Sequence, residues 1–309
     1  MRFLRRTRCK IVYRSEYFSG VHARNSRQTF DVMKFKKVRD RLIQEKLIRR
    51  QDILVPPRIS EQDLQLVHSR KYLKSLNDPV RVGEILNLDY VNPWDNYIYE
   101  YFRYVAGGTV QAAEYAAEHP LPVFNLGGGF HHGHSDRAEG FCLINDVAVA
   151  VEKLRRRSKI RKVLMIDLDY HQGNGNLLYF KEDEEVFTFS MHASNWAQVS
   201  SKRNNVDIEM PGHVHDEKYM KTLIAELPSV FGRFSPDMVF YLAGSDPFAE
   251  DTLGDFDISE KGMLERDQYV YRLVRKRKLP LVVLGAGGYG PQSWRIYYNF
   301  IKWVILKGK

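Results

Sequence analysis

Five short apolar segments recur along the chain of 309 residues, and each ends in polar or glycine-rich residues. The segments are continuously apolar, as in "VLMID" (163–167), and do not alternate with polar residues. Such strands are typical of a parallel sheet covered by helices, because both faces of each strand are then buried. The five segments are residues 121–126, 162–169, 186–192, 237–246 and 279–288.

Helix-like patterns occupy the intervals between these segments. Ser60 and Asp63 form a capping-box pattern ahead of a helical stretch at 61–76. In the first helix, at 31–48, one face carries Val32, Phe35, Val38, Leu42 and Leu47. Further helices are expected at 95–118, 146–157, 216–231, 259–276 and 291–306. The chain shows no repeat and no linker-like stretch, so we expect a single α/β domain over residues 1–309.

The composition excludes two classes of protein. No run of about 18 apolar residues is present, so no segment is expected to span a membrane. Cys9 and Cys142 are the only cysteines, which excludes a disulfide framework and a cysteine-rich zinc motif. A reducing, cytoplasmic setting is therefore expected.

The chain is basic, because Lys and Arg exceed Asp and Glu by 47 to 38. Much of the excess lies in 153–162 and 272–278, where we expect it at the ends of two helices, facing the negative end of the dipole. A patch for nucleic acid or acidic partners is the alternative, and the site chemistry does not require nucleic acid. The basic N-terminus "MRFLRRTRCK" lacks the apolar run of about 7–15 residues that a secretory signal needs. We expect it to belong to the fold, with organelle targeting as the alternative.

The strand at 162–169 ends in an unusual polar pattern. Asp167, Asp169 and His171 occupy every second position, so their side chains share one face. Buried carboxylates and an imidazole are costly unless something satisfies them, and Asp and His together suit Zn²⁺. Asp246 ends another strand at the same edge of the sheet and can supply a third ligand. A hydrogen-bonded polar cluster is the alternative for any one of these residues alone.

Two histidines follow another strand end, in "GGGFHHGHSD" (127–136). His131 and His132 come directly after three glycines and a phenylalanine, where the backbone can take unusual conformations. Histidine titrates near neutral pH and is the usual general acid or base. The pair is therefore a candidate for proton transfer opposite the predicted metal, while His134 is interpreted as a loop residue.

The last strand runs into "GAGGYG", where Gly285, Gly287 and Gly290 match the dinucleotide-binding pattern. That fold needs a further strand with an acidic residue about 20 residues later, and the chain has neither. We interpret the segment as a glycine-rich turn that presents Tyr289. A phenol can stabilise an oxyanion that develops during a reaction.

These motifs together resemble the zinc-dependent histone deacetylases. The matching segments are "GGGFHHGHSDRAEGFCLIND", "DLDYHQGNG", "AGSD" and "GAGGY", and the similarity extends over most of the chain. The forms "HQGNG", "TFDVMKFKKV" and "LVHSRKYL" are most similar to the class IV deacetylases. The resemblance implies the arginase/deacetylase fold, a single α/β domain around a mainly parallel eight-stranded sheet.

The resemblance also implies a role for each matching residue. One Zn²⁺ would be bound by Asp169, His171 and Asp246. His132 would act as general base and then acid, His131 as its electrostatic partner, oriented by Asp167, and Tyr289 as donor to the oxyanion. The acyl-lysine tunnel would be lined by Gly140, Phe141, Leu253 and Gly287, with the loop 193–206 and its Trp196 at the rim. A structural K⁺ would use Asp167, Ser190 and backbone carbonyls of Asp169, His171 and Met191.

One position departs from the class I deacetylases, where an aspartate supports the second histidine of the pair. The matching residue here is Asn174, as in class IV members. A neutral amide can orient the ring, but it stabilises an imidazolium less than a carboxylate does.

Three other functions compete with a lysine deacylase. Ureohydrolases of the same fold hold two Mn²⁺ ions through further aspartates, but Gln172 and Gly173 follow His171 here, which predicts one metal. Acetylpolyamine deacetylases carry a glutamate near the tunnel mouth, where this chain has Leu253, an apolar residue that suits acyl-lysine with an acetyl or longer chain. A catalytically inactive acyl-lysine reader is the third alternative, and the complete set of zinc ligands, histidines and Tyr289 argues against it.

Overall fold

A computed structural model describes residues 8–17, 31, 33–86, 88, 92–157, 160–198 and 204–308. Their eight strands form one sheet in the order β2-β1-β3-β8-β7-β4-β5-β6, and every neighbouring pair is parallel. The strands are β1 (Lys10–Val12), β2 (Ile53–Leu54), β3 (Val123–Asn125), β4 (Val163–Asp167), β5 (Val186–His192), β6 (Asn205–Glu209), β7 (Met238–Leu242) and β8 (Leu281–Leu284). The predicted α/β fold is thus confirmed, with a sheet that is entirely parallel.

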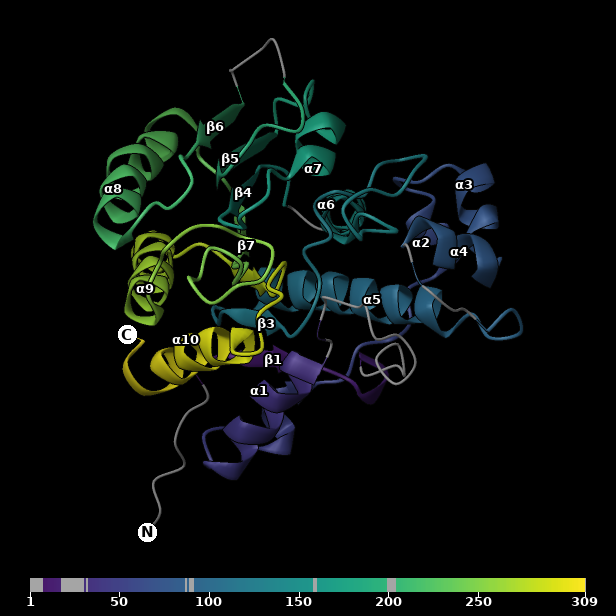
Figure 1. The fold of residues 1–309 in the computed structure, drawn as a ribbon, viewed down its shortest axis with the longest axis horizontal. Helices are drawn as coiled ribbons and strands as arrows, with labels where there is room; N and C mark the ends of the chain where they lie inside the picture. The colour runs from purple at the N-terminus through teal and green to yellow at the C-terminus, as the bar shows by residue number, and fades with distance from the viewer. Residues whose placement is uncertain are drawn as a thin grey trace.

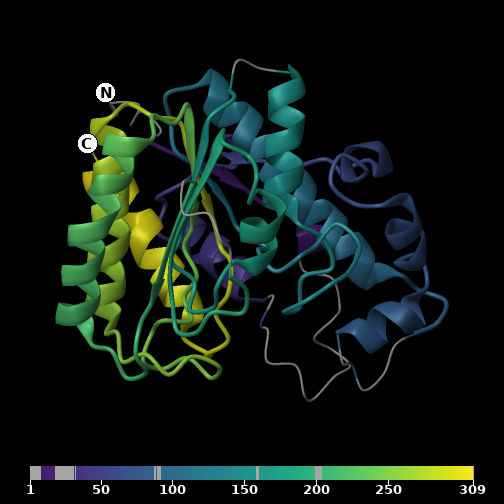
Figure 2. The same cartoon turned by 90° about the horizontal axis from the view of Figure 1, so that it is seen from above.

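Helices cover both faces of the sheet. Figure 2 shows α8, α9 and α10 on one side and α5 and α6 on the other, while α2, α3 and α4 lie beyond α5, away from the sheet. Figure 1 labels the elements and shows the same arrangement from another direction, with α8 and α9 on the left of the strands and α6 on the right. The helices are α1 (Met33–Gln44), α2 (Glu61–Leu64), α3 (Arg70–Ser75), α4 (Pro79–Ile85), α5 (Tyr97–Glu118), α6 (Asp146–Arg157), α7 (Asn174–Tyr179), α8 (Asp216–Arg233), α9 (Glu260–Lys276) and α10 (Ser293–Lys307), with short 3-10 turns at Ser15–Tyr17 and Arg50–Asp52.

The central strands are buried as their apolar sequences predict. Every residue of β4, β7 and β8 is buried. In α1, the predicted face buries Phe35, Val38 and Leu42. Val32, residues 1–7 and residues 199–203 of the predicted rim loop lie outside the described part of the chain.

The stretch 61–76, predicted as one helical region, divides into α2 and α3. Ser60 caps α2 as predicted, by accepting a hydrogen bond from the Asp63 N–H at 3.0 Å. A second cap forms at Ser69, whose hydroxyl accepts from the Tyr72 N–H at 3.2 Å. Between the two helices His68 is buried against the loop before α6, where its Nε2 accepts from the Asn145 N–H at 3.0 Å. The predicted helical stretch is therefore interrupted after Leu64, and the segment between the two helices makes this tertiary contact.

The predicted placement of the basic residues is also found. The last turn of α6 carries Arg155, Arg156 and Arg157, and that of α9 carries Arg275 and Lys276. Among the helices of the described residues, none combines the length and hydropathy needed to cross a bilayer.

Candidate metal centre and active site

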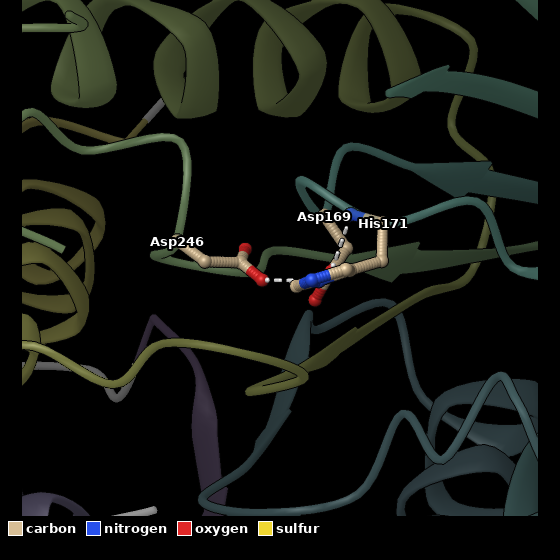
Figure 3. A group of neighbouring side chains, drawn as sticks. All are labelled: Asp169, His171 and Asp246. Atoms are coloured by element: carbon tan, nitrogen blue, oxygen red, sulfur yellow. Dashed lines mark hydrogen bonds and ion pairs between the residues drawn. The ribbon is translucent and has the colours of Figure 1, made fainter. Parts of the chain in front are cut away.

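The loops after β4 and β7 bring three predicted metal ligands together. Asp169, His171 and Asp246 point toward one another at the carboxyl edge of the sheet (Figure 3). Nδ1 of His171 lies 3.3 Å from an Asp169 carboxylate oxygen and 3.2 Å from one of Asp246. One ligand atom from each of the three residues lies within 4.8 Å of the others, and both carboxylates are fully buried.

The electrostatics of this cluster favour a bound cation. Burial and the charge of Asp169 together raise the pKa of Asp246 above its usual value, whereas, despite burial, the charges of His131 and His171 hold the pKa of Asp169 well below its usual value. Burial opposes the charged form of His171, but hydrogen bonds and charges from Asp169 and Asp246 raise the pKa of its imidazole to about 10. The two buried carboxylates thus attract positive charge between them, and their oxygens with an imidazole nitrogen make a donor set suited to Zn²⁺.

Gly244 and Gly287 pack closely against the carboxylates of Asp169 and Asp246. The Gly287 N–H donates to Oδ2 of Asp169 at 2.7 Å. A Cβ on Gly287 would lie only 2.4 Å from Oδ2 of Asp246, and one on Gly244 only 2.5 Å from Oδ2 of Asp169. Any side chain at either position would therefore displace the carboxylates, and Gly287 belongs to the wall of the metal cluster.

The histidine pair is held by two different partners. Nδ1 of His131 lies 2.8 Å from Oδ2 of Asp167, and Nδ1 of His132 lies 2.6 Å from Oδ1 of Asn174, the first residue of α7. Burial would lower the pKa of His131, but the charges of Asp167 and Asp169 raise it to about 9. Burial and the charge of His131 hold the pKa of His132 well below its usual value. At neutral pH one ring is therefore charged, and the other is neutral and able to accept a proton.

The loop that carries the pair is fixed by α6 and by a tight turn. The Asp146 carboxylate at the start of α6 accepts from the N–H groups of Gly129 and Phe130 at 3.0 and 2.7 Å. Gly140 has φ +52°, and a Cβ there would lie 2.1 Å from the His132 ring. Phe141 follows with φ +61° and remains 47% exposed, with its ring centre 6.3 Å from that of Tyr289.

Tyr289 sits on a turn that is held from both sides. The N–H groups of Tyr289 and Gly290 donate to Oδ2 of Asp251 at 2.7 and 3.1 Å. On the other side, Nζ of buried Lys34 donates to the Gly288 carbonyl at 2.9 Å. The Tyr289 ring lies edge-on to His171, with 6.2 Å between centres. Burial and the charges of Asp246 and Asp169 raise the pKa of Tyr289 well above its usual value, so the hydroxyl remains a donor.

Trp196 joins the site through the loop after β5. Its ring stacks on His132 with 4.3 Å between centres and an interplanar angle of 15°. The Gln172 side chain orders this loop, because its Oε1 accepts from the N–H groups of Trp196 and Ala197, both at 2.8 Å. Trp196 is 43% exposed and therefore lies between the histidine pair and solvent.

The remaining predicted residues lie at the edges of this cluster. Ser190 is next to Asp167 in the pairing of β4 with β5, and its hydroxyl lies 2.6 Å from Nδ1 of His192. Met191, the next residue of β5, is fully buried. Leu253 is exposed on the loop after β7, and its N–H donates to Asp251, the carboxylate that also holds Tyr289.

Comparison with known proteins gives the family. A model of the family described as "Histone deacetylase domain" matches residues 28–300. The chain belongs to the histone deacetylase family. It is 31% identical to "Histone deacetylase 2" of Arabidopsis thaliana, over 98% of this chain and 80% of that protein. It is 28% identical to "Histone deacetylase 8" of Xenopus tropicalis, over 79% and 70% of the two chains.

Solved structures agree with this assignment. A crystal structure of an HDAC homolog from Aquifex aeolicus superimposes with a TM-score of 0.80 at 25% identity, covering 96% of this chain and 84% of that one. The HDA15 HD domain superimposes equally well at 22% identity, with a TM-score of 0.80 over 97% and 91% of the chains, and shows the shared fold. As a histone deacetylase family member, the chain is a hydrolase of the deacetylase type with the arginase/deacetylase fold.

Four residues that hold the loops of the candidate site have no role predicted from the sequence. Lys34 and Asp251 hold the Tyr289 turn, Asp146 holds the loop of the histidine pair, and Gln172 holds the loop of Trp196. For Gln172 and Asp146 a signal exists, because both lie within the motifs "DLDYHQGNG" and "LIND". Lys34 also lies within a quoted segment, "TFDVMKFKKV", but its run of lysines, "KFKK", is typical of an exposed helix face and gives no sign that this lysine is buried.

Proposed function

We propose that this histone deacetylase family member is a zinc-dependent lysine deacylase, which hydrolyses the amide of N6-acyl-lysine in proteins or peptides. The observation that carries the proposal is the buried cluster of Asp169, His171 and Asp246, with a charged and a neutral histidine beside it. Zinc bound there would supply a Lewis acid that polarises the acyl carbonyl and lowers the pKa of a water.

His132, His131 and Tyr289 have different roles in the proposed reaction. Neutral His132, with its Nδ1–H directed to Asn174, has Nε2 free to take the proton of the attacking water and then to protonate the leaving lysine amine. His131 remains a cation between Asp167 and Asp169, and its positive charge stabilises the negative charge that develops in the transition state. The Tyr289 hydroxyl donates to the oxyanion of the tetrahedral intermediate.

The proposal extends to the substrate and to a second cation. Gly140, Phe141, Leu253 and Gly287 would line the tunnel for the acyl-lysine chain. K⁺ would be held by Asp167, Ser190 and the backbone carbonyls of Asp169, His171 and Met191. We further propose one catalytic domain over residues 1–309, of class IV type, acting in a reducing cytoplasmic setting. The single-domain part of this proposal is supported by the one eight-stranded sheet, because the proposed catalytic residues lie at the ends of its strands or in the segments that follow them.

An acetylpolyamine is a less favoured substrate than acyl-lysine, because of the residues at the entrance of the proposed tunnel. Glu250 and Asp251 lie close to Leu253 in the sequence, and Asp251 already accepts hydrogen bonds from the N–H groups of Tyr289, Gly290 and Leu253. Its carboxylate is therefore occupied in holding two turns. Leu253 leaves an apolar position where a cationic amine would need a counter-charge.

Product release from lysine peptides tests the function. Peptides with acyl groups from acetyl to myristoyl are incubated with the protein, with and without a zinc chelator. We expect release that the chelator abolishes and that added Zn²⁺ restores, and the most efficient chain length reports the depth of the tunnel. Absence of release from every peptide, in protein verified to contain zinc, would contradict the proposal and favour a small-molecule amide substrate or a reader.

Replacing Asn174 by aspartate is expected to shift the pH–rate profile without abolishing turnover. A carboxylate that accepts from Nδ1–H of His132 favours the imidazolium and raises the pKa of that ring, by about one unit or more. His132 acts as a base only when neutral, so the acidic limb of kcat/KM moves to higher pH. The measurement is kcat/KM against pH for both proteins, with the exposed Asn77→Asp as a charge-matched control. An unchanged profile would show that Asn174 does not tune His132.

A further inference from the structure

Arg266 is a fully buried arginine on α9 that contacts the backbone of both metal-ligand loops. Its Nη1 donates to the Leu168 carbonyl at 3.0 Å and to the Gly244 carbonyl at 2.8 Å. Its Nε and Nη2 lie 2.9 and 2.8 Å from Oδ1 of Asp267, which also accepts from the Tyr241 hydroxyl. The guanidinium is thus neutralised by its neighbour in the chain, while one nitrogen joins two loops that are distant in sequence.

The two carbonyls lie where the sheet stops pairing. β4 and β7 are paired up to Asp167 and Leu242, and Leu168 and Gly244 lie just beyond these last paired residues. Both residues are buried, and a buried carbonyl needs a donor. Arg266 supplies that donor to both loops at once.

The same two residues lead directly into the metal ligands. Leu168 immediately precedes Asp169, and Gly244 is two residues before Asp246. The carboxylates of Asp169 and Asp246 repel each other until a cation lies between them, so the two loops need a restraint that keeps them close. We propose that Arg266 is a positioning residue of the metal centre, whose bridge between the Leu168 and Gly244 carbonyls sets the spacing of Asp169 and Asp246 and thereby tightens binding of the divalent metal. This inference rests on the zinc site of the proposed function.

The geometry explains why arginine occupies this position. The planar guanidinium presents several donors in a rigid arrangement, so it can pair with Asp267 and bridge two carbonyls simultaneously. A lysine ammonium carries the same charge at the end of a flexible stem and lacks that fixed arrangement. Arg266→Lys therefore keeps the positive charge beside Asp267 and removes the rigid bridge.

Three variants separate positioning from a purely structural role. Arg266→Lys weakens the bridge, whereas Tyr241→Phe removes a hydrogen bond from the same buried charge pair and leaves the bridge in place. Arg272→Lys, on an exposed position of the same helix, is the matched control. The Zn²⁺ affinity of each full-length protein is measured by competition with a chromophoric chelator, together with the Co²⁺ absorption spectrum and urea unfolding of the metal-free protein.

We expect Arg266→Lys to bind Zn²⁺ about 10- to 100-fold more weakly than the wild type, the usual range for partners that orient metal ligands. Its Co²⁺ spectrum should change as well. Tyr241→Phe should unfold at lower urea concentration with its Zn²⁺ affinity unchanged, and Arg272→Lys should match the wild type. Equal affinity in Arg266→Lys and the wild type, or equal losses in Arg266→Lys and Tyr241→Phe, would overturn the inference.

A second variant covers the case in which Arg266→Lys does not fold. Arg266→Gln combined with Asp267→Asn removes both buried charges, so it leaves no unpaired charge in the core, and it replaces the guanidinium by a shorter amide. The same loss of Zn²⁺ affinity is expected, and wild-type affinity in this folded variant would overturn the inference. Failure of the wild-type protein itself to bind Zn²⁺ would instead contradict the proposed function.

Discussion

Replacing Asp246 by asparagine is expected to abolish zinc binding and hydrolysis together. Asp246 is fully buried, and one of its oxygens lies 3.2 Å from Nδ1 of His171. Its other oxygen accepts from the Tyr170 N–H at 3.0 Å, a bond that an asparagine oxygen can keep. The variant therefore preserves shape and loses the negative charge that binds the cation.

The expected loss of Zn²⁺ affinity is more than about 100-fold, because removing a partner that only orients a ligand already costs about 10- to 100-fold. Zinc content and peptide hydrolysis are measured on the same preparations. Asp257→Asn is the control, since its half-exposed side chain pairs with His213 on the surface. Tight, stoichiometric zinc in the Asp246→Asn protein would exclude Asp246 from the metal centre.

Replacing Tyr289 by phenylalanine should separate metal binding from catalysis. The turn is held through backbone groups, by Asp251 on one side and Lys34 on the other, so a phenylalanine ring should occupy the same place. Only the hydroxyl is lost, and removal of one oxyanion donor lowers kcat by about 10²–10³-fold. We therefore expect full zinc content with turnover reduced by that factor.

Single-turnover and steady-state hydrolysis of an acyl-lysine peptide, with zinc quantified in parallel, measure this effect. Tyr115→Phe, at the far end of α5 where the ring stacks on His119, serves as the control for loss of a tyrosine hydroxyl. Turnover close to that of the wild type in Tyr289→Phe would remove Tyr289 from the mechanism.

The central strands could be predicted because burial on both faces requires continuous apolar sequence. β4, β5, β7 and β8 all lie within predicted segments, and α6 matches its predicted range of 146–157. The edge strands β2 and β6 were not predicted. β2 has only two residues, and β6 carries polar residues and is partly exposed, so neither shows the apolar run by which a buried strand is recognised.

The proximity of Asp169, His171 and Asp246, the candidate metal ligands, could be predicted for a related reason. Asp169 and His171 are close in sequence, and Asp246 follows another buried strand whose carboxyl end must meet the same edge of the sheet. Arg266 and Lys34, by contrast, support the site through hydrogen bonds to residues that are far away in the sequence. Arg266 reaches Leu168 across 98 positions, and Lys34 reaches Gly288 across 254, so no local pattern marks either contact.

The sequence by itself determined the class of fold, the family and the residues available for metal and proton chemistry, because these depend on local periodicity and on motifs at strand ends. Only the tertiary structure decided that the pKa values of the two histidines shift in opposite directions, since Asp167 and Asp169 lie close to His131 while His132 faces neutral Asn174 and the charge of His131. It also decided which buried groups join the loops of Asp169 and Asp246 and which hold the Tyr289 turn in place. Burial and long-range hydrogen bonds set these properties, and both arise only when distant segments pack together.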